Sequence, residues 1–259
     1  LETRKQNQAI AQQDAIREFH LTAAPTQWEA MANRPIDIWA YNQQVPGPEI
    51  RVTEGDPLRI VVENQLPEPT TIHWHGVPVP NAMDGVPQLT QEAILPDGRF
   101  VYEFTAWPAG TYIYHSHEGY QLDQGLYGAL IIEPKREPRS YDREYVLVLD
   151  DWANVDGGGP AQARAGNVRS QMGMGRGMMR RNRRTPQNMP LLEPLYDLYT
   201  VNGREARLSE PFIVRRGERV RLRIGNLASA TTFMLRLAGH PLFITHADGR
   251  PVEPIPVDV

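Results

Sequence analysis

Four of the seven histidines in this 259-residue chain form two pairs with one residue between the partners, His73 with His75 and His115 with His117. Successive side chains of a β-strand point to opposite faces, so each pair would place both imidazoles on one face. Two such pairs at the ends of neighbouring strands would bring three or four imidazoles to one site. The spacing therefore predicts a metal site, and imidazole ligation alone allows copper, zinc, iron or nickel. A pH-sensing cluster is the alternative, because histidine titrates near neutral pH.

The segments around these pairs have the lengths and turn signals of short strands. In the first half, strands are expected at 36–41, 49–53, 58–64, 92–95, 100–105, 111–115 and 126–133. Turn sequences such as VPGP and EGDP separate them, and no convincing amphipathic helix lies between them. This pattern favours an antiparallel β-sandwich. Trp74 is expected to pack on the face opposite to its flanking histidines.

The second half has the same pattern. Strands are expected at 145–149, 197–201, 211–215, 219–224, 232–237 and 242–247. The segment TVNGREARLSEPFIVRRGERVRLRIGN resembles AYNQQVPGPEIRVTEGDPLRIVVEN of the first half in strand order, turn chemistry and the closing Asn. The chain is therefore predicted to be all-β, with two copies of one Greek-key sandwich. Because the sequence stops where another strand is expected, the second copy is expected to be incomplete.

These patterns divide the chain into four parts. We expect an amino-terminal arm at 1–19, a first domain at 20–136 that carries both histidine pairs, a linker at 137–143 and a second domain at 144–259. Within the second domain, residues 156–190 are rich in Gly, Arg and Met and have no apolar periodicity, so they are predicted to be a mobile loop.

Composition excludes several classes of function. Lys and Arg number 27 against 31 Asp and Glu, so the net charge of -4 offers no basic field for nucleic acid. The absence of cysteine excludes disulfides, zinc-thiolate and iron-sulfur sites, thiol nucleophiles and cysteinyl copper. No apolar run reaches the roughly 18 to 20 residues of a membrane-spanning helix. The polar opening, which begins with Leu, predicts either a cytoplasmic protein or one whose leader has been removed.

Two longer motifs surround the histidine pairs. TIHWHGVPVPNAMDGVPQLTQ, at 71–91, and GTYIYHSHEGYQLDQGLYGALIIE, at 110–133, closely resemble the first two copper motifs of the multicopper oxidases, which include laccases, ascorbate oxidase, ferroxidases and bacterial copper-resistance oxidases. The lead-in PGPEIRVTEGDPLRIVVENQL and the second half are similar to that family's first and second domains. The resemblance covers nearly all of the chain after about residue 35 and implies two tandem cupredoxin-like sandwiches.

The resemblance implies a role for each matching residue. His73 would bind a type 2 copper, His75 one type 3 copper, and His115 and His117 the type 3 pair. The resulting trinuclear cluster would reduce O2 to water with four electrons. Asp84 matches a family carboxylate that assists protonation and water exchange, a role suited to a reaction that consumes protons. Its alternative role is that of a turn former in the Asp-Gly pair.

The chain departs from the family pattern in what it lacks. Three-domain members take four further cluster histidines, and the Cys, His and usual Met of the type 1 copper, from their third domain. The chain is therefore expected to supply half of the cluster ligands and to be inactive without a carboxy-terminal cupredoxin domain of the same protein. That domain is either deleted or a separate fragment, and the Arg-rich stretch 176–184 is a candidate for proteolysis.

The resemblance also predicts partners and location. The reductant is expected to be Cu(I) or a phenol and the oxidant O2, with the protein periplasmic or extracellular. The alternative is a non-catalytic copper-binding module for storage or delivery.

The remaining candidates have structural interpretations. His20 stands alone in the sequence and is predicted to lie on the surface, whereas His240 and His246 are predicted to be structural. Trp107 and Trp152 are predicted to lie in the core or at its rim. Five methionines of the predicted mobile loop could form a weak Cu(I) site, because thioethers are soft ligands. They are Met172, Met174, Met178, Met179 and Met189. Against this interpretation, neighbouring arginines would repel a cation, and Met in a flexible loop needs no function.

Overall fold

The computed structural model describes residues 15–153 and 196–257. Within these ranges the protein is built from β-strands and one 3-10 turn, η1 (Asn81–Met83). The prediction of an all-β fold is therefore confirmed. The predicted loop at 156–190 and its five methionines lie outside the described residues.

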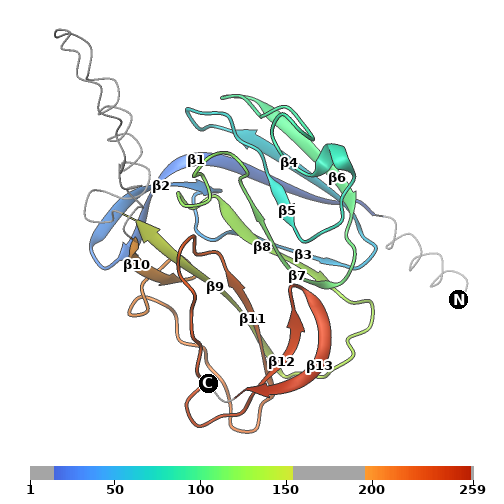
Figure 1. The fold of residues 1–259 in the computed structure, drawn as a ribbon, viewed down its shortest axis with the longest axis vertical. Coiled ribbons are helices and arrows are strands. Elements are labelled where there is room, and N and C mark those ends of the chain that lie inside the picture. Colours follow the sequence, from blue (N-terminus) through green and yellow to red (C-terminus); the bar gives the residue numbers. More distant parts are fainter. Residues whose placement is uncertain (1–14, 154–195, 258–259) are drawn as a thin grey trace, which may run out of the picture.

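The first half forms two packed sheets (Figure 1). One sheet has the order β2-β1-β4-β6, from β1 (Arg17–Met31), β2 (Arg34–Tyr41), β4 (Pro57–Asn64) and β6 (Arg99–Thr105). The other has the order β3-β8-β7-β5, from β3 (Gly47–Thr53), β5 (His73–His75), β7 (Gly110–His115) and β8 (Tyr127–Glu133). Ile60 and Val62 of the first sheet join Trp74 and Tyr114 of the second in one buried cluster, so this half is a closed sandwich.

The pairing is mixed rather than wholly antiparallel. β1 runs parallel to β4, and β3 runs parallel to β8, while the remaining pairs of this sandwich are antiparallel. The expected antiparallel sandwich is corrected on this point, because an alternating pattern fixes which face is buried but carries no information about strand direction. The strand expected at 92–95 is also absent, since only a single bridge joins Ile94 to Thr70.

Two predicted boundaries fall inside strands. β1 begins at Arg17, within the arm predicted at 1–19, and β9 begins at Arg143, the last residue of the linker predicted at 137–143. The start of β1 pairs in parallel with β4, and Leu21 and Ala23 within this paired stretch are buried. This pairing joins residues far apart in the sequence, so the polar local sequence did not reveal it.

The second half contains two smaller sheets. β9 (Arg143–Ala153) lies between β10 (Tyr196–Val201) and β11 (Val220–Asn226), and β12 (Leu242–Ala247) pairs with β13 (Arg250–Val257). The prediction of strands at 211–215 and 232–237 is wrong, because those segments are irregular in the described structure. Their apolar residues have the strand pattern but no strand pairs with them there.

The predicted repeat is confirmed in the hydrogen bonds that the two copies share. β1, β2 and β4 have the same pairing pattern as β9, β10 and β11, with one antiparallel and one parallel ladder each. Asn42 and Asn202 follow the equivalent strands with φ of 52 and 53°. The side-chain oxygen of Asn42 accepts a bond from Thr22 N at 2.7 Å, and that of Asn202 accepts one from Val148 N at 2.8 Å.

Ion pairs join the two halves at the end of β8 that lies away from His115. Arg51 pairs with Glu133 of β8 and with Glu144 of β9, and Arg223 of β11 pairs with the same two carboxylates. Arg223 also donates to Thr111 of β7 at 2.7 Å. Because Thr111 and Glu133 belong to the sheet that bears the histidines, this network fixes the second half against that sheet.

Candidate metal centre

The two histidine pairs meet because the strands that carry them pair directly. In the antiparallel ladder of β5 and β7, His73 lies opposite His115, Trp74 opposite Tyr114 and His75 opposite Ile113. Trp74 is fully buried and its ring contacts Tyr114, so it packs on the face away from the histidines, as predicted. The alternation of a strand therefore places both imidazoles of the first pair on the other face.

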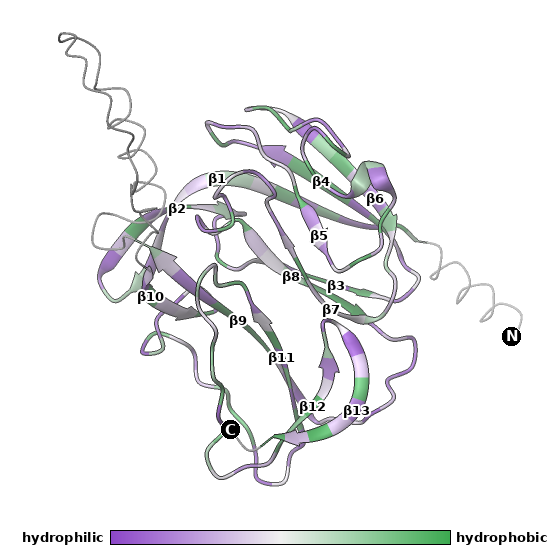
Figure 2. Cartoon of the chain, in the orientation of Figure 1, coloured by the Kyte–Doolittle hydropathy of each residue, from purple (hydrophilic) through white to green (hydrophobic). Residues whose placement is uncertain are grey.

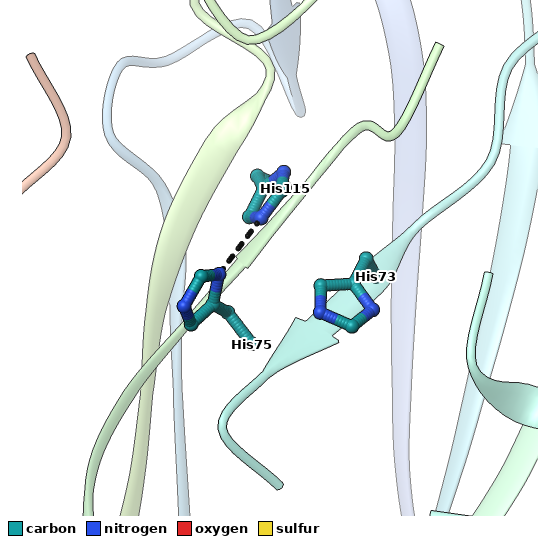
Figure 3. A group of neighbouring side chains, drawn as sticks. All are labelled: His73, His75 and His115. Carbon is teal, nitrogen blue, oxygen red and sulfur yellow. Dashed lines mark hydrogen bonds between the residues drawn. The ribbon is translucent and has the colours of Figure 1, made fainter. Parts of the chain in front are cut away.

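All four predicted histidines gather at one place. The ring centroid of His73 lies 5.6 Å from that of His75, 5.4 Å from His115 and 5.5 Å from His117. One ring nitrogen from each of His73, His75 and His115 lies within 4.8 Å of the others, and Figure 3 shows these three rings grouped together. Within the described residues, this is the cluster of potential metal ligands that the structure forms.

Backbone carbonyls fix the tautomers of two ligand candidates. The Nδ1 atom of His73 lies 2.8 Å from the carbonyl oxygen of Asp84, and the Nδ1 atom of His115 lies 2.8 Å from the carbonyl oxygen of Ser116. A carbonyl oxygen can only accept, so both Nδ1 atoms carry the proton. Each Nε2 atom therefore carries a lone pair that a metal can take, in the arrangement that metal-binding histidines commonly use. In the structure the Nε2 atom of His115 accepts a hydrogen bond from His75 Nδ1 at 3.3 Å (Figure 3).

Burial favours the neutral forms of His115 and His75. Desolvation lowers the pKa of His115 to about 4, against a smaller opposing effect of its bond to the Ser116 carbonyl. Desolvation and the neighbouring His73 also lower the pKa of His75, while the carboxylate of Asp248 opposes this shift. Metal ligation requires the unprotonated imidazole, so both residues are ready to bind at neutral pH.

Asp84 lies beside this cluster in a tight turn after η1. Its carboxylate Oδ1 is 3.4 Å from Nδ1 of His73, and its side chain is partly exposed. The turn needs Gly85, whose φ is +78° and where an added Cβ would lie 1.9 Å from the Ile72 carbonyl oxygen. Asp84 therefore has both properties considered from the sequence, a turn position and a carboxylate next to the histidines.

Two features near the cluster were not predicted. Asp248, in the turn between β12 and β13, brings a charge from the second half toward His75. Beneath the second histidine pair, Thr70, Ser116 and Gln121 form a buried polar network. No local signal in the sequence marks this network, because Ser116 and Gln121 lie in a stretch, 115–125, where polar residues are common.

The remaining candidates lie away from the cluster. His20 is exposed and contacts Glu18, as predicted for a surface residue. His240 and His246 are also exposed, so neither fills a core position. Trp152 is buried in the core between the halves, whereas Trp107 is 55% exposed at a turn. None of the described helices has the length and apolar character needed to cross a membrane.

Comparison with known proteins gives a consistent result. Family models described as multicopper oxidase match residues 22–137 and 143–259. The multicopper oxidase MmcO of Mycobacterium tuberculosis is 37% identical over 239 residues, which are 86% of this chain and 45% of that protein. A copper resistance protein A homolog of Pseudomonas syringae pv. tomato is 34% identical over 266 residues, 93% of this chain and 44% of that protein.

The fold comparison agrees. The blue copper oxidase of Nitrosomonas europaea, a solved structure, has 30% identity and a TM-score of 0.76, over 94% of this chain and 71% of that one. The tandem cupredoxin-like fold is thus confirmed. The chain spans about half the length of the curated relatives described above.

Proposed function

Because the chain belongs to the multicopper oxidase family, we propose that it is the amino-terminal portion of an oxidase that couples one-electron oxidation of a small reductant to reduction of O2 to water. The observation that carries the proposal is the convergence of His73, His75, His115 and His117 from two directly paired strands. A set of imidazoles without thiolate fits copper, which supplies one-electron redox chemistry when bound. Zinc would fit the same donors but not the redox reaction.

In this proposal the four histidines hold half of a trinuclear copper cluster. His73 serves the type 2 ion, and His75, His115 and His117 serve the type 3 pair. The bonds from Nδ1 of His73 and His115 to backbone carbonyls support these roles, because they orient each Nε2 atom toward the cluster. The depressed pKa of His115 further supports ligation at neutral pH.

We assign Asp84 the role of a proton relay. Reduction of O2 to water consumes protons, which must reach a partly enclosed site. The carboxylate of Asp84 is partly exposed to solvent and lies 3.4 Å from the His73 ring, so it can take a proton from water and hold it beside the cluster. The bond between His73 Nδ1 and the Asp84 backbone keeps that carboxylate in place.

The other half of the site is assigned to a carboxy-terminal cupredoxin domain of the same protein, which would also hold the type 1 copper. The second half also exposes an apolar surface, which further strands of its own incomplete sandwich would cover. Many of its large side chains are exposed, and Figure 2 shows apolar segments along β13. They include Ile213, Val214, Ile224, Met234, Phe243 and Ile255. The chain alone would therefore bind copper without turning over.

The copper-resistance relative favours Cu(I) as the reductant, with phenols as the second substrate class to test. We also propose a periplasmic or extracellular location, as the copper-resistance relatives suggest. The five methionines between residues 172 and 189 remain candidates for weak Cu(I) binding.

The substitution His115→Ala in the full-length protein tests the proposal. We expect loss of cluster copper and of O2 consumption with Cu(I) or a phenol, while the metal-free melting temperature stays close to that of the wild type. The matched control is His20→Ala, which removes an exposed histidine outside the cluster. If the wild-type protein consumes no O2 but loses its copper on His115→Ala substitution, the non-catalytic binding module is favoured instead.

A further inference from the structure

His117 needs an explanation for its position that the strand pairing does not provide. The ladder of β5 and β7 ends at the pair of His73 and His115, so His117 lies two residues beyond the last paired residue. It is exposed and belongs to no strand. Its ring centroid nevertheless lies 5.5 Å from that of His73. Contacts outside this ladder therefore hold the loop, and one of them is the backbone hydrogen bond from Ser116 N to the Leu126 carbonyl oxygen at 2.9 Å.

The side-chain amide of Gln121 makes three hydrogen bonds beneath the loop. Its Oε1 atom accepts from the Thr70 hydroxyl at 2.7 Å and from the Ser116 hydroxyl at 2.7 Å. Its Nε2 atom donates to the Pro69 carbonyl oxygen at 2.7 Å. Gln121 is 1% exposed, Thr70 0% and Ser116 4%, so water cannot replace these bonds.

These bonds join the two histidine motifs. Ser116 lies between His115 and His117, whereas Thr70 lies three residues before His73. Thr70 is itself fixed by two backbone hydrogen bonds to Ile94, at 2.8 and 3.0 Å. The amide therefore attaches the loop of the second pair to a rigid point just ahead of the first.

An amide of this length satisfies all three partners without a change of protonation state. The two hydroxyls need an acceptor and the carbonyl needs a donor, so an ionised carboxylate would leave the Pro69 carbonyl unpaired. An apolar side chain would leave all three groups without their bonds. Asn has the right chemistry but is one methylene shorter.

We infer that Gln121 is a positioning residue for His117, which it holds within reach of the other three imidazoles. This inference rests on the proposed copper function. It assigns no contact between Gln121 and the metal, because the amide acts through Ser116 and the backbone of the loop.

A double-mutant cycle tests this role on the 259-residue chain, with Cu(II) affinity measured by competition against a chelator. We expect Gln121→Leu to weaken Cu(II) binding about 10- to 100-fold, the usual effect of losing a group that orients a ligand. In a His117→Ala background the same substitution should cost less than about threefold, because the ligand it positions is gone. In a His75→Ala background the larger loss should persist.

The control is Gln124→Leu. Gln124 is equally buried in the same turn, and its Oε1 atom makes no hydrogen bond within the described structure. This substitution should leave Cu(II) affinity within about threefold. If Gln121→Leu does not fold without metal, Ser116→Ala takes its place in the cycle, since it removes one of the two hydroxyls that bind the amide.

The outcomes separate the two proposals. No loss of affinity in Gln121→Leu, or equal losses in the His117→Ala and wild-type backgrounds, would overturn the positioning role alone. If the His73→Ala and His115→Ala variants bind Cu(II) as tightly as the wild-type chain, the proposed copper site itself is refuted.

Discussion

The two copies of the repeat begin with the same three strands and differ in what covers them. Val62 of β4 and Ile224 of β11 occupy equivalent positions, two residues before the closing Asn of each motif. Val62 is fully buried beneath the sheet that bears the histidines, whereas Ile224 is 38% exposed. Among the described residues of the second half, no second sheet packs over β11 in this way.

This difference separates the features that the repeated motif determines from those that occur in one copy. The pairing pattern and the Asn hydrogen bonds recur in both copies, so they depend on the repeated motif itself. The covering sheet does not recur among the described residues of the second half, and the sequence of that half has no second pair of histidines spaced like those of the first copy. The candidate metal centre is therefore a property of the cover and not of the repeated trio of strands.

Equivalent substitutions at Val62 and Ile224 should have the most unequal effects. Val62→Asp would bury a charge in a closed core and should cost about 4 kcal/mol or more. Ile224→Asp should change the free energy of unfolding by no more than about 0.5 kcal/mol. Urea denaturation of both variants measures this. Similar losses would break the comparison, because they would mean that the second copy is closed in solution.

Asp150 distinguishes the copies by its pH dependence. Its equivalent in the first copy is Ala24, whereas Asp150 is 1% exposed, and burial raises its pKa to about 7 despite bonds from Trp152 Nε1 and the Asp151 amide. The folded state thus keeps a proton that the unfolded chain loses near pH 4, so stability should fall as pH rises from about 4 to 7.

Asp150→Asn should remove this slope, which we expect to be on the order of a few kcal/mol across that interval. Urea titrations of both proteins at pH 5 and pH 8 provide the measurement. The variant should gain stability relative to the wild type at the higher pH. A constant difference between the two proteins at both values would mean that Asp150 is ionised throughout.

Asn42 and Asn202 should show the smallest contrast, because their surroundings are the same. The side chain of Asn42 makes two hydrogen bonds to the backbone of β1, and that of Asn202 makes two to the backbone of β9. Each residue also has a positive φ, which Ala tolerates poorly. We expect Asn42→Ala and Asn202→Ala each to cost about 2 kcal/mol. The corresponding Asp substitutions keep the acceptor and should cost less. Markedly different losses at the two sites would contradict the structural equivalence of the repeats.

Much of the fold followed from local signals in the sequence. Turn residues and alternation located most strands of the first half, and the spacing of the histidines placed His73 and His75 on one strand face. The parallel pairing of β1 with β4 was not predictable, because period-two alternation carries no direction. The segments at 211–215 and 232–237 have strand patterns, but strand formation also requires a partner.

The candidate site was predicted at the level of its four histidines and the Asp84 carboxylate, but not of the contacts that hold them. The role of the Asp84 carbonyl as acceptor for His73, and the amide of Gln121 beneath His117, depend on contacts between segments distant in the sequence. Asp248 comes from the other copy of the repeat and approaches His75 only through packing of the two halves. Such contacts require the tertiary structure.

Anomalous X-ray diffraction from crystals of the copper-loaded chain would show whether the two histidine pairs share a copper site. We expect copper density bonded to the Nε2 atoms of His73 and His115, with His75 and His117 beside it. Copper found only at exposed histidines such as His20 or His240, with no density between the two pairs, would contradict this expectation.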